Sequence, residues 1–149
     1  MSSILQDGGK TFKPAYGAQV AGYTAGTTYD NIEHTCLTLD RLGYDSLQIN
    51  IHHLLSLTAD KTLKATVTLQ DCTTAQGTYA DYSTVATDYT CATGALTASK
   101  GVTSFNVDLS GCDRYIQALV SLDLNASGTD TCQAYIEYIL TGARSLPVS

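Results

Sequence analysis

The side chains of this sequence best suited to acid–base or metal chemistry are its three histidines, His34, His52 and His53. His52 and His53 are adjacent in a segment where apolar and polar residues alternate, as in a β-strand. Neighbouring side chains of a strand point to opposite faces, so these two rings cannot easily bind one metal ion. His34 shares a strand face with Cys36, but this spacing is common by chance and is only weak support for a catalytic dyad.

Sequence motifs for other enzyme chemistries are absent from the chain. It contains no G-x-S-x-G nucleophile elbow, no G-x-x-x-x-G-K phosphate loop and no G-x-G-x-x-G dinucleotide loop. The 14 Asp and Glu residues supply carboxylates, but nothing selects one pair of them as acid and base. The sequence therefore predicts a protein that is not an enzyme and that needs no cofactor.

The cysteines are five in number and widely spaced, without any C-x-x-C pair. Zinc sites and redox motifs need such close pairs, so neither is predicted. We expect free thiols that pack as small hydrophobic side chains, with one late-forming disulfide as the alternative. The residues are Cys36, Cys72, Cys91, Cys112 and Cys132.

Two glycine-centred corners carry the most suggestive acidic residues. In the segment VDLSGCDRYIQ, Asp108 and Asp113 flank Gly111, yet a calcium loop would need a denser run of oxygen ligands, as in D-x-D-x-D-G. The same Gly-Xaa-Asp pattern occurs at Gly43 and Asp45. Because chemistry rarely appears twice within one structural repeat, the recurrence favours turns at both places, with a positive φ at each glycine. No metal site is predicted.

The elements that must position these corners are strands. Period-two alternation runs through residues 47–57, 63–69, 105–109, 116–124 and 134–140, and residues 78–86 form a plausible edge strand. No segment has a convincing helical stripe with caps. The sequence predicts an all-β protein.

The alternating pattern is repeated within the chain. Residues 39–45 align with residues 107–113 at a constant offset of 68, and in each copy a long strand, a polar turn and a final strand follow. The polar turns are residues 58–61 and residues 125–130, and Gly128 and Asp130 are the expected turn residues of the second. We interpret this as two three-stranded antiparallel units that pack face to face as a β-sandwich.

The N-terminal residues have a different character. Residues 1–30 are rich in Gly, Thr, Ala and Tyr without clear alternation, which predicts an extended arm, and residues 31–149 are assigned to the sandwich. Tyr16, Tyr23 and Tyr29 are the expected anchors of this arm on a partner, since tyrosine offers a large contact area with few rotamers. A terminus without any partner is the alternative.

Charge and hydropathy restrict the partners. The net charge is −6 and the pI is near 4.7, which argues against nucleic acid because phosphate binding needs clustered Lys and Arg. No apolar run approaches the ~18 residues of a membrane span, and the first residues lack the features of a signal peptide. We therefore expect a soluble protein made in the cytoplasm, with no membrane or nucleic-acid partner.

The C-terminal segment FNVDLSGCDRYIQALVSLDLNASGTDTCQAYIEYILTGARSLP resembles the end of a group of small virion proteins of tailed bacteriophages. The most specific features are the S-G-T-D-T turn and the closing G-A-x-x-L-P. The segments LDRLGYDSLQI and GTYADYSTVAT resemble upstream parts of the same group, so the likeness covers most of residues 31–149. The chain departs from the group at Cys112 and Cys132, where small or charged residues are expected.

This group resembles capsid decoration (cement) proteins. The resemblance implies a jelly-roll-like sandwich, a homotrimer, and a position on the outer surface of the phage head, where the trimer clamps neighbouring subunits of the major capsid protein. Two alternatives remain open: a tail or host-recognition β-module that binds carbohydrate through exposed aromatic side chains, and a ring-forming head-completion or tail-tube protein.

Overall fold

The computed structural model describes residues 12–125 and 128–144, and these residues form nine β-strands and no helix. The prediction of an all-β protein is confirmed. None of the described residues belongs to a helix able to cross a membrane. The strands are β1 (Lys13–Thr24), β2 (Glu33–Thr35), β3 (Leu39–Asp40), β4 (Tyr44–Leu57), β5 (Thr62–Cys72), β6 (Ala80–Thr93), β7 (Leu96–Asp108), β8 (Tyr115–Leu124) and β9 (Thr131–Ala143).

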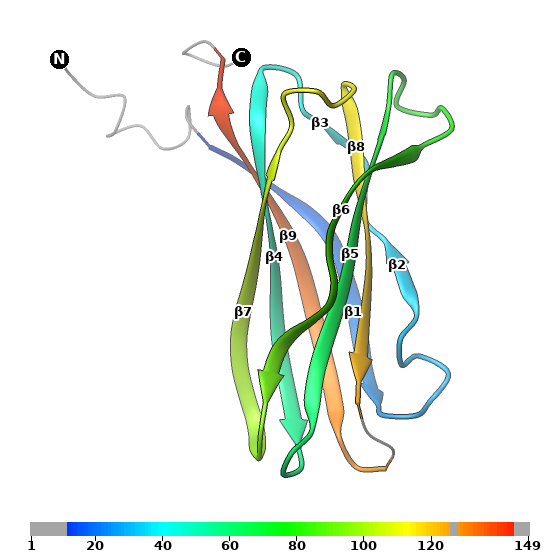
Figure 1. The fold of residues 1–149 in the computed structure, drawn as a ribbon, viewed down its shortest axis with the longest axis vertical. Coiled ribbons are helices and arrows are strands. Elements are labelled where there is room, and N and C mark those ends of the chain that lie inside the picture. The colour runs from blue at the N-terminus through cyan, green and yellow to red at the C-terminus, as the bar shows by residue number, and fades with distance from the viewer. Residues whose placement is uncertain (1–11, 126–127, 145–149) are drawn as a thin grey trace, which may run out of the picture.

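The strands form two antiparallel sheets that face each other (Figure 1). Sheet A has the order β1-β9-β4-β7. Sheet B has the order β2-β8-β5-β6, and β3 pairs with the same strand, β8, as β2 does. The chain crosses between the sheets at almost every connection, and its first and last strands lie side by side in sheet A. This connectivity is that of a jelly roll, and it confirms the predicted antiparallel sandwich.

The core lies between the sheets and is mainly aliphatic. Alternate side chains of the central strands point inward, as period-two alternation requires, and each buried aliphatic residue contributes roughly 1.5–3 kcal/mol. Side chains with at most 1% exposure include Leu47, Ile49 and Ile51 of β4, Leu63, Val67 and Leu69 of β5, Ile116, Val120 and Leu122 of β8, and Ile136 and Leu140 of β9.

Two tyrosines of sheet A form hydrogen bonds across this core to sheet B. The Tyr138 hydroxyl oxygen accepts a bond from the backbone N–H of Ala118 at 2.7 Å, and the Tyr23 hydroxyl donates to the Leu122 carbonyl oxygen at 2.9 Å. Burial raises the pKa of both hydroxyls, so both remain protonated. The bonds satisfy polar groups that would otherwise be buried without partners.

The sequence predicted that each repeated unit forms a sheet of its own, and this prediction is wrong. Each unit places one long strand in sheet A and one in sheet B, so that β4 of the first unit pairs with β9 of the second, and β5 pairs with β8. The units are therefore interlocked. The physical reason is that alternation fixes only which face of a strand is buried, and both arrangements bury the same faces.

The predicted arm over residues 1–30 is wrong for residues 13–24, which form β1 at the edge of sheet A. The sandwich therefore begins before residue 31. Alternation was hidden because the pairing of β1 with β9 shifts register twice, once between Tyr16 and Ala18 and once between Val20 and Tyr23. A bulge inserts an extra residue and reverses the inward and outward positions that follow it. Residues 1–11 of the predicted arm lie outside the described residues.

Candidate functional site

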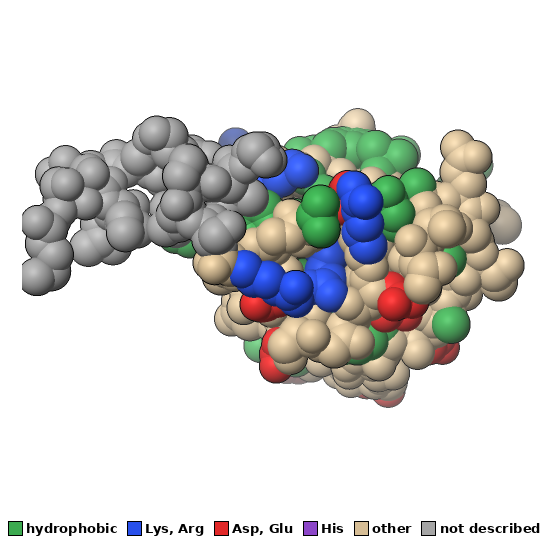
Figure 2. Space-filling model, turned by 90° about the horizontal axis from the view of Figure 1, so that it is seen from above, with side chains coloured by type: hydrophobic (Ala, Val, Ile, Leu, Met, Phe, Trp, Pro, Cys, Tyr) green, Lys and Arg blue, Asp and Glu red, His purple; other side chains and the backbone are tan. Residues whose placement is uncertain are grey.

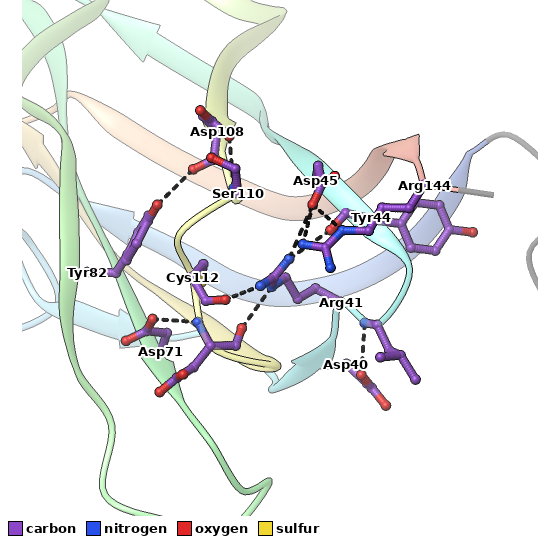
Figure 3. A network of polar contacts seen from close by, with 12 residues as sticks. Asp40, Arg41, Tyr44, Asp45, Asp71, Tyr82, Asp108, Ser110, Cys112 and Arg144 are labelled. Carbon is purple, nitrogen blue, oxygen red and sulfur yellow. Dashed lines mark hydrogen bonds and ion pairs between the residues drawn. The ribbon is translucent and has the colours of Figure 1, made fainter.

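The two glycine-centred corners meet at one end of the sandwich (Figure 3). The guanidinium of Arg41, from the first corner, donates to the carbonyl oxygens of Cys112 and Asp113 in the second corner, the latter at 2.8 Å. It also donates to the carbonyl oxygen of Tyr44 at 3.0 Å. Arg41 is only 9% exposed. Its planar fork of donors therefore satisfies three backbone carbonyls and joins the repeated units where they meet.

Two more exposed ion pairs surround this buried arginine. Arg144, just after β9, contacts Asp45 at 2.6 Å, and Arg114 contacts Asp40 at 2.7 Å. Hydrogen bonds from these arginines hold the pKa of both aspartates below its ordinary value. Their side chains are about one-third to one-half exposed, so water screens both pairs and their contribution to stability is small.

The corners differ in backbone conformation. Gly43 has φ 88°, and the N–H of Tyr44 donates to the Arg41 carbonyl at 2.9 Å, so Gly43 lies where a tight turn requires a positive φ. Gly111 does not have a positive φ, which corrects the prediction made from the repeat. Its corner nevertheless makes the equivalent backbone bond, from the Cys112 N–H to the Leu109 carbonyl at 3.0 Å, and the Ser110 N–H donates to the Asp108 carboxylate at 2.8 Å.

The other predicted turn residues lie at both ends of the molecule. Asp113 is exposed at the corner end, where its N–H donates to the Asp71 carboxylate at 2.8 Å. At the opposite end Gly128 has φ 116°. Asp130 is 2% exposed and accepts a bond from the Thr58 N–H at 2.9 Å, so the two polar turns of the repeat also meet. These residues stabilise connections between strands.

The corner end, defined as residues 39–45, residues 108–114 and Arg144, carries every arginine of the chain: Arg41, Arg114 and Arg144. Figure 2, which looks onto this end, shows Lys and Arg side chains gathered there beside hydrophobic ones. Leu42 is 64% exposed at the tip of its turn. Exposed Leu beside partly exposed Arg in an otherwise acidic protein is a composition that suits a protein–protein contact.

The three tyrosines predicted to anchor an arm have different environments. Tyr23 is 5% exposed and belongs to the core, so its predicted role as an anchor on a partner is wrong. Tyr16 is 46% exposed and Tyr29 is 68% exposed, and their contact with a partner stays a prediction. Tyr23 was misassigned because the bulged strand β1 gave no sign that its side chain points inward.

Sequence analysis missed a groove of 610 Å³ on the outer face of sheet A. Tyr135 lines it and is 39% exposed, with its ring centroid 5.8 Å from that of His52. The Nε2 atom of His52 lies 3.1 Å from a Glu137 carboxylate oxygen. The polar residues at alternate positions of β4 and β9 indicated that one face of each strand is exposed. They could not indicate that the two strands are neighbours, which is what brings these side chains together.

The histidines and cysteines form no metal site among the described residues. His53 points away from His52, as predicted for adjacent strand residues, and packs against Gly101. All five cysteines have free thiols in the structure, and four of them are buried. Burial raises the pKa of Cys36 and Cys132 to about 11, which keeps both thiols protonated at neutral pH.

These features define an all-β protein with a jelly-roll fold, and the comparisons with known proteins agree with that class. The VP2 subviral particle of infectious bursal disease virus has a similar structure, with a TM-score of 0.53, 14% identity, and coverage of 91% of this chain and 34% of the viral chain. The T13 particle of the same virus gives a TM-score of 0.52, 13% identity, and coverage of 89% of this chain and 31% of the viral chain. At this identity the likeness establishes the fold.

This chain spans about a third of the length of those capsid chains. The CBM22-1 xylan-binding domain from Paenibacillus barcinonensis Xyn10C covers 86% of this chain at 12% identity, but its TM-score of 0.39 is too low to establish a shared fold. No family model matches the sequence. No curated protein matches it either.

Proposed function

We propose that this protein is a structural virion protein that decorates the outer surface of a phage head and stabilises contacts between major capsid subunits. The observation that carries the proposal is a jelly-roll fold in a chain whose C-terminal segment resembles small virion proteins of tailed phages. The fold is one that viral capsid chains also use.

The corner end is the surface that we assign to the capsid contact. It presents Leu42, which is 64% exposed, together with the half-exposed side chains of Arg114 and Arg144, and arginine is enriched in the centres of protein interfaces. Four aspartates of the same end (Asp40, Asp45, Asp108 and Asp113) balance its three arginines, so the assignment rests on the exposed Leu42 and on the arginine donors, and not on net charge. In this arrangement a homotrimer would present three such ends to neighbouring capsid subunits.

The proposal is tested by heating complete heads and heads that lack this protein side by side while DNA release is followed. A protein that binds only the assembled lattice stabilises it by mass action, so heads without it should release DNA at a lower temperature. Equal release temperatures would contradict the decoration role. So would density for this chain on the tail alone in an electron-microscopy map of the particle.

The contact surface is tested by adding purified variants back to heads that lack the protein. Leu42→Asp changes an exposed tip residue and should reduce binding to heads, because it places a carboxylate in the apolar part of the contact. Ile32→Asp is the matched control: Ile32 is 40% exposed and follows Asn31, which bonds to Leu122 near the opposite end. If both variants bind like the parent, the corner end is not the capsid contact.

A further inference from the structure

We propose that the outer face of sheet A is a binding site for a neutral pyranose oligosaccharide. The groove of 610 Å³ lies across all four strands of this sheet, and its size falls within the roughly 300–1,000 Å³ of small-molecule sites. The inference does not depend on the decoration role, because it concerns a different surface from the corner end.

Strand register builds the groove. Gln19, Tyr135, His52 and Val102 are cross-strand partners and form one row over β1, β9, β4 and β7. Gln133, Leu54 and Lys100 form the next row of the same face, two residues further along β9, β4 and β7. Between these rows Gly101 and Ala134 line the floor of the groove, while their side-chain positions face the core beside His53.

Tyr135 supplies an aromatic wall that is held in place on both sides. Its ring centroid is 5.4 Å from that of Tyr16, at an interplanar angle of 52°, and 5.8 Å from that of His52, at 50°. The bulge at Gly17 allows the contact between Tyr16 and Tyr135. It brings Tyr16 and Gln19 to the same face of the sheet although they are three positions apart in the sequence. A fixed, partly exposed ring is suited to the C–H face of a pyranose, which is flat and apolar.

A chain of hydrogen bonds orients the polar side of the groove. The Ser104 hydroxyl donates to Asn50 Oδ1 at 2.7 Å, and Asn50 Nδ2 donates to a Glu137 carboxylate oxygen at 3.3 Å. The same oxygen lies 3.1 Å from His52 Nε2. This chain lies in the row next to Tyr135 and holds the imidazole of His52 before any ligand arrives, which lowers the entropy cost of binding.

The groups that face the ligand favour a neutral, hydroxyl-rich molecule. Gln19 and Gln133 carry amides, which donate and accept hydrogen bonds as hydroxyl groups require. Lys100 is the single cation in the lining, and the Glu137 carboxylate outside it is already engaged by His52 and Asn50. A charged ligand would therefore find little complementary charge. A second copy of this chain would bring a further net charge of −6 to the same face, which opposes self-association there.

The test uses the full chain with cellohexaose, xylohexaose, maltohexaose and chitohexaose as probes. Saturation-transfer NMR detects binding, and tyrosine emission is a second signal because the chain contains no tryptophan. We expect at least one hexasaccharide to bind. Tyr135→Ala should weaken its binding about tenfold, the effect of losing one aromatic contact. Glu137→Gln should weaken it less, because the amide keeps the shape of the carboxylate but changes its bonds to His52 and Asn50.

The matched control is Tyr29→Ala, which removes a more exposed tyrosine from the loop between β1 and β2 and should leave the affinity unchanged. Thermal melting of each variant separates lost binding from lost folding. The proposal is overturned if no probe binds, or if folded Tyr135→Ala binds as tightly as the parent. It is also overturned if sedimentation shows that Tyr135→Ala dissociates an oligomer, since the face would then be a contact between copies.

Discussion

At the scale of single residues, Arg41 shows why a charged side chain is buried in this protein. Three backbone carbonyls converge on its guanidinium, and a lysine ammonium cannot match that fork. Arg41→Lys should therefore lower the free energy of unfolding by about 1–3 kcal/mol, the cost of leaving buried acceptors unsatisfied. Urea denaturation followed by circular dichroism measures the change.

The control for Arg41 lies in the same network. Arg144→Lys replaces a side chain that is 51% exposed and keeps a charge beside Asp45, so it should lower the free energy of unfolding much less than Arg41→Lys does. Equal losses for the two variants would mean that burial at Arg41 does not matter, and that the corners are joined by other contacts.

The two corner glycines give a second prediction at this scale. Alanine at Gly43, where φ is 88°, should cost about 1–2 kcal/mol because a Cβ atom clashes with its own backbone there. Alanine at Gly111 should be nearly neutral, since the added Cβ would meet only the Tyr82 hydroxyl at the ordinary contact distance of 3.5 Å. Thermal melting of the two variants tests this difference, and similar melting temperatures would contradict it.

His53 gives a prediction about pH. Burial, and then the neighbouring His52, hold its pKa below the ordinary value, and its Nδ1 atom is buried without a hydrogen-bond partner among the described residues. In the unfolded chain His53 takes up a proton at about pH 6.5, whereas in the folded chain it does so only at a lower pH. The free energy of unfolding therefore falls as the pH drops from about 6.5 through the lowered pKa of the folded chain. His53→Leu should flatten this loss.

The measurement for His53 is the melting temperature between about pH 7 and pH 5, a window above the ordinary range of carboxylates. Asp40 and Asp45 also have a lowered pKa, but the stability that their ion pairs provide is lost only at more acidic pH. An unchanged pH profile in His53→Leu would show that another group titrates in this window.

At the scale of elements, regular strands were predictable and bulged strands were not. The predicted segments 47–57, 63–69 and 116–124 lie within β4, β5 and β8, because each buries one face without interruption. The edge segment 78–86 largely overlaps β6, but β6 continues to Thr93 through four register shifts against β5, which break the alternation. The same effect concealed β1. Pairing partners and the groove on sheet A could not be predicted, since they depend on contacts between residues far apart in sequence.

The bulge in β1 is itself testable. A Cβ atom at Gly17 would lie 2.8 Å from the carbonyl oxygen of Ile136 in the paired strand, and neither backbone can easily move. Gly17→Ala should therefore destabilise the fold by about 1–3 kcal/mol, as overpacking does. Gly22→Ala in the same strand is the control, because its added Cβ would meet nothing within 4 Å. Equal stability of the two variants by urea denaturation would show that the close approach at Gly17 is not needed.

At the scale of the whole molecule, the jelly roll makes the first and last described strands, β1 and β9, neighbours in one sheet. The fold class followed from alternation and from the repeat, yet the repeat could not show that its units interlock. Neither unit can form a sandwich alone, because each sheet depends on a pair of neighbouring strands from different units: β4 with β9 in sheet A, and β5 with β8 in sheet B. The corners and the polar turns that join the units at the two ends are a consequence of this topology.

Removing residues 1–30 tests this view directly, because an arm could be deleted without loss of the fold. Deletion takes away β1, exposes the paired edge of β9, and removes the buried side chains of Val20 and Tyr23. Each of these side chains contributes roughly 1.5–3 kcal/mol, a large share of the roughly 5–15 kcal/mol that stabilises a domain. We expect the fragment 31–149 to lose cooperative melting by circular dichroism and to aggregate through the exposed edge. A chain that begins at residue 12 keeps β1 to β9, the strands that the structure describes, and should melt cooperatively. Cooperative melting of the 31–149 fragment near the parent temperature would mean that β1 is dispensable and that β9 can serve as the edge strand of sheet A.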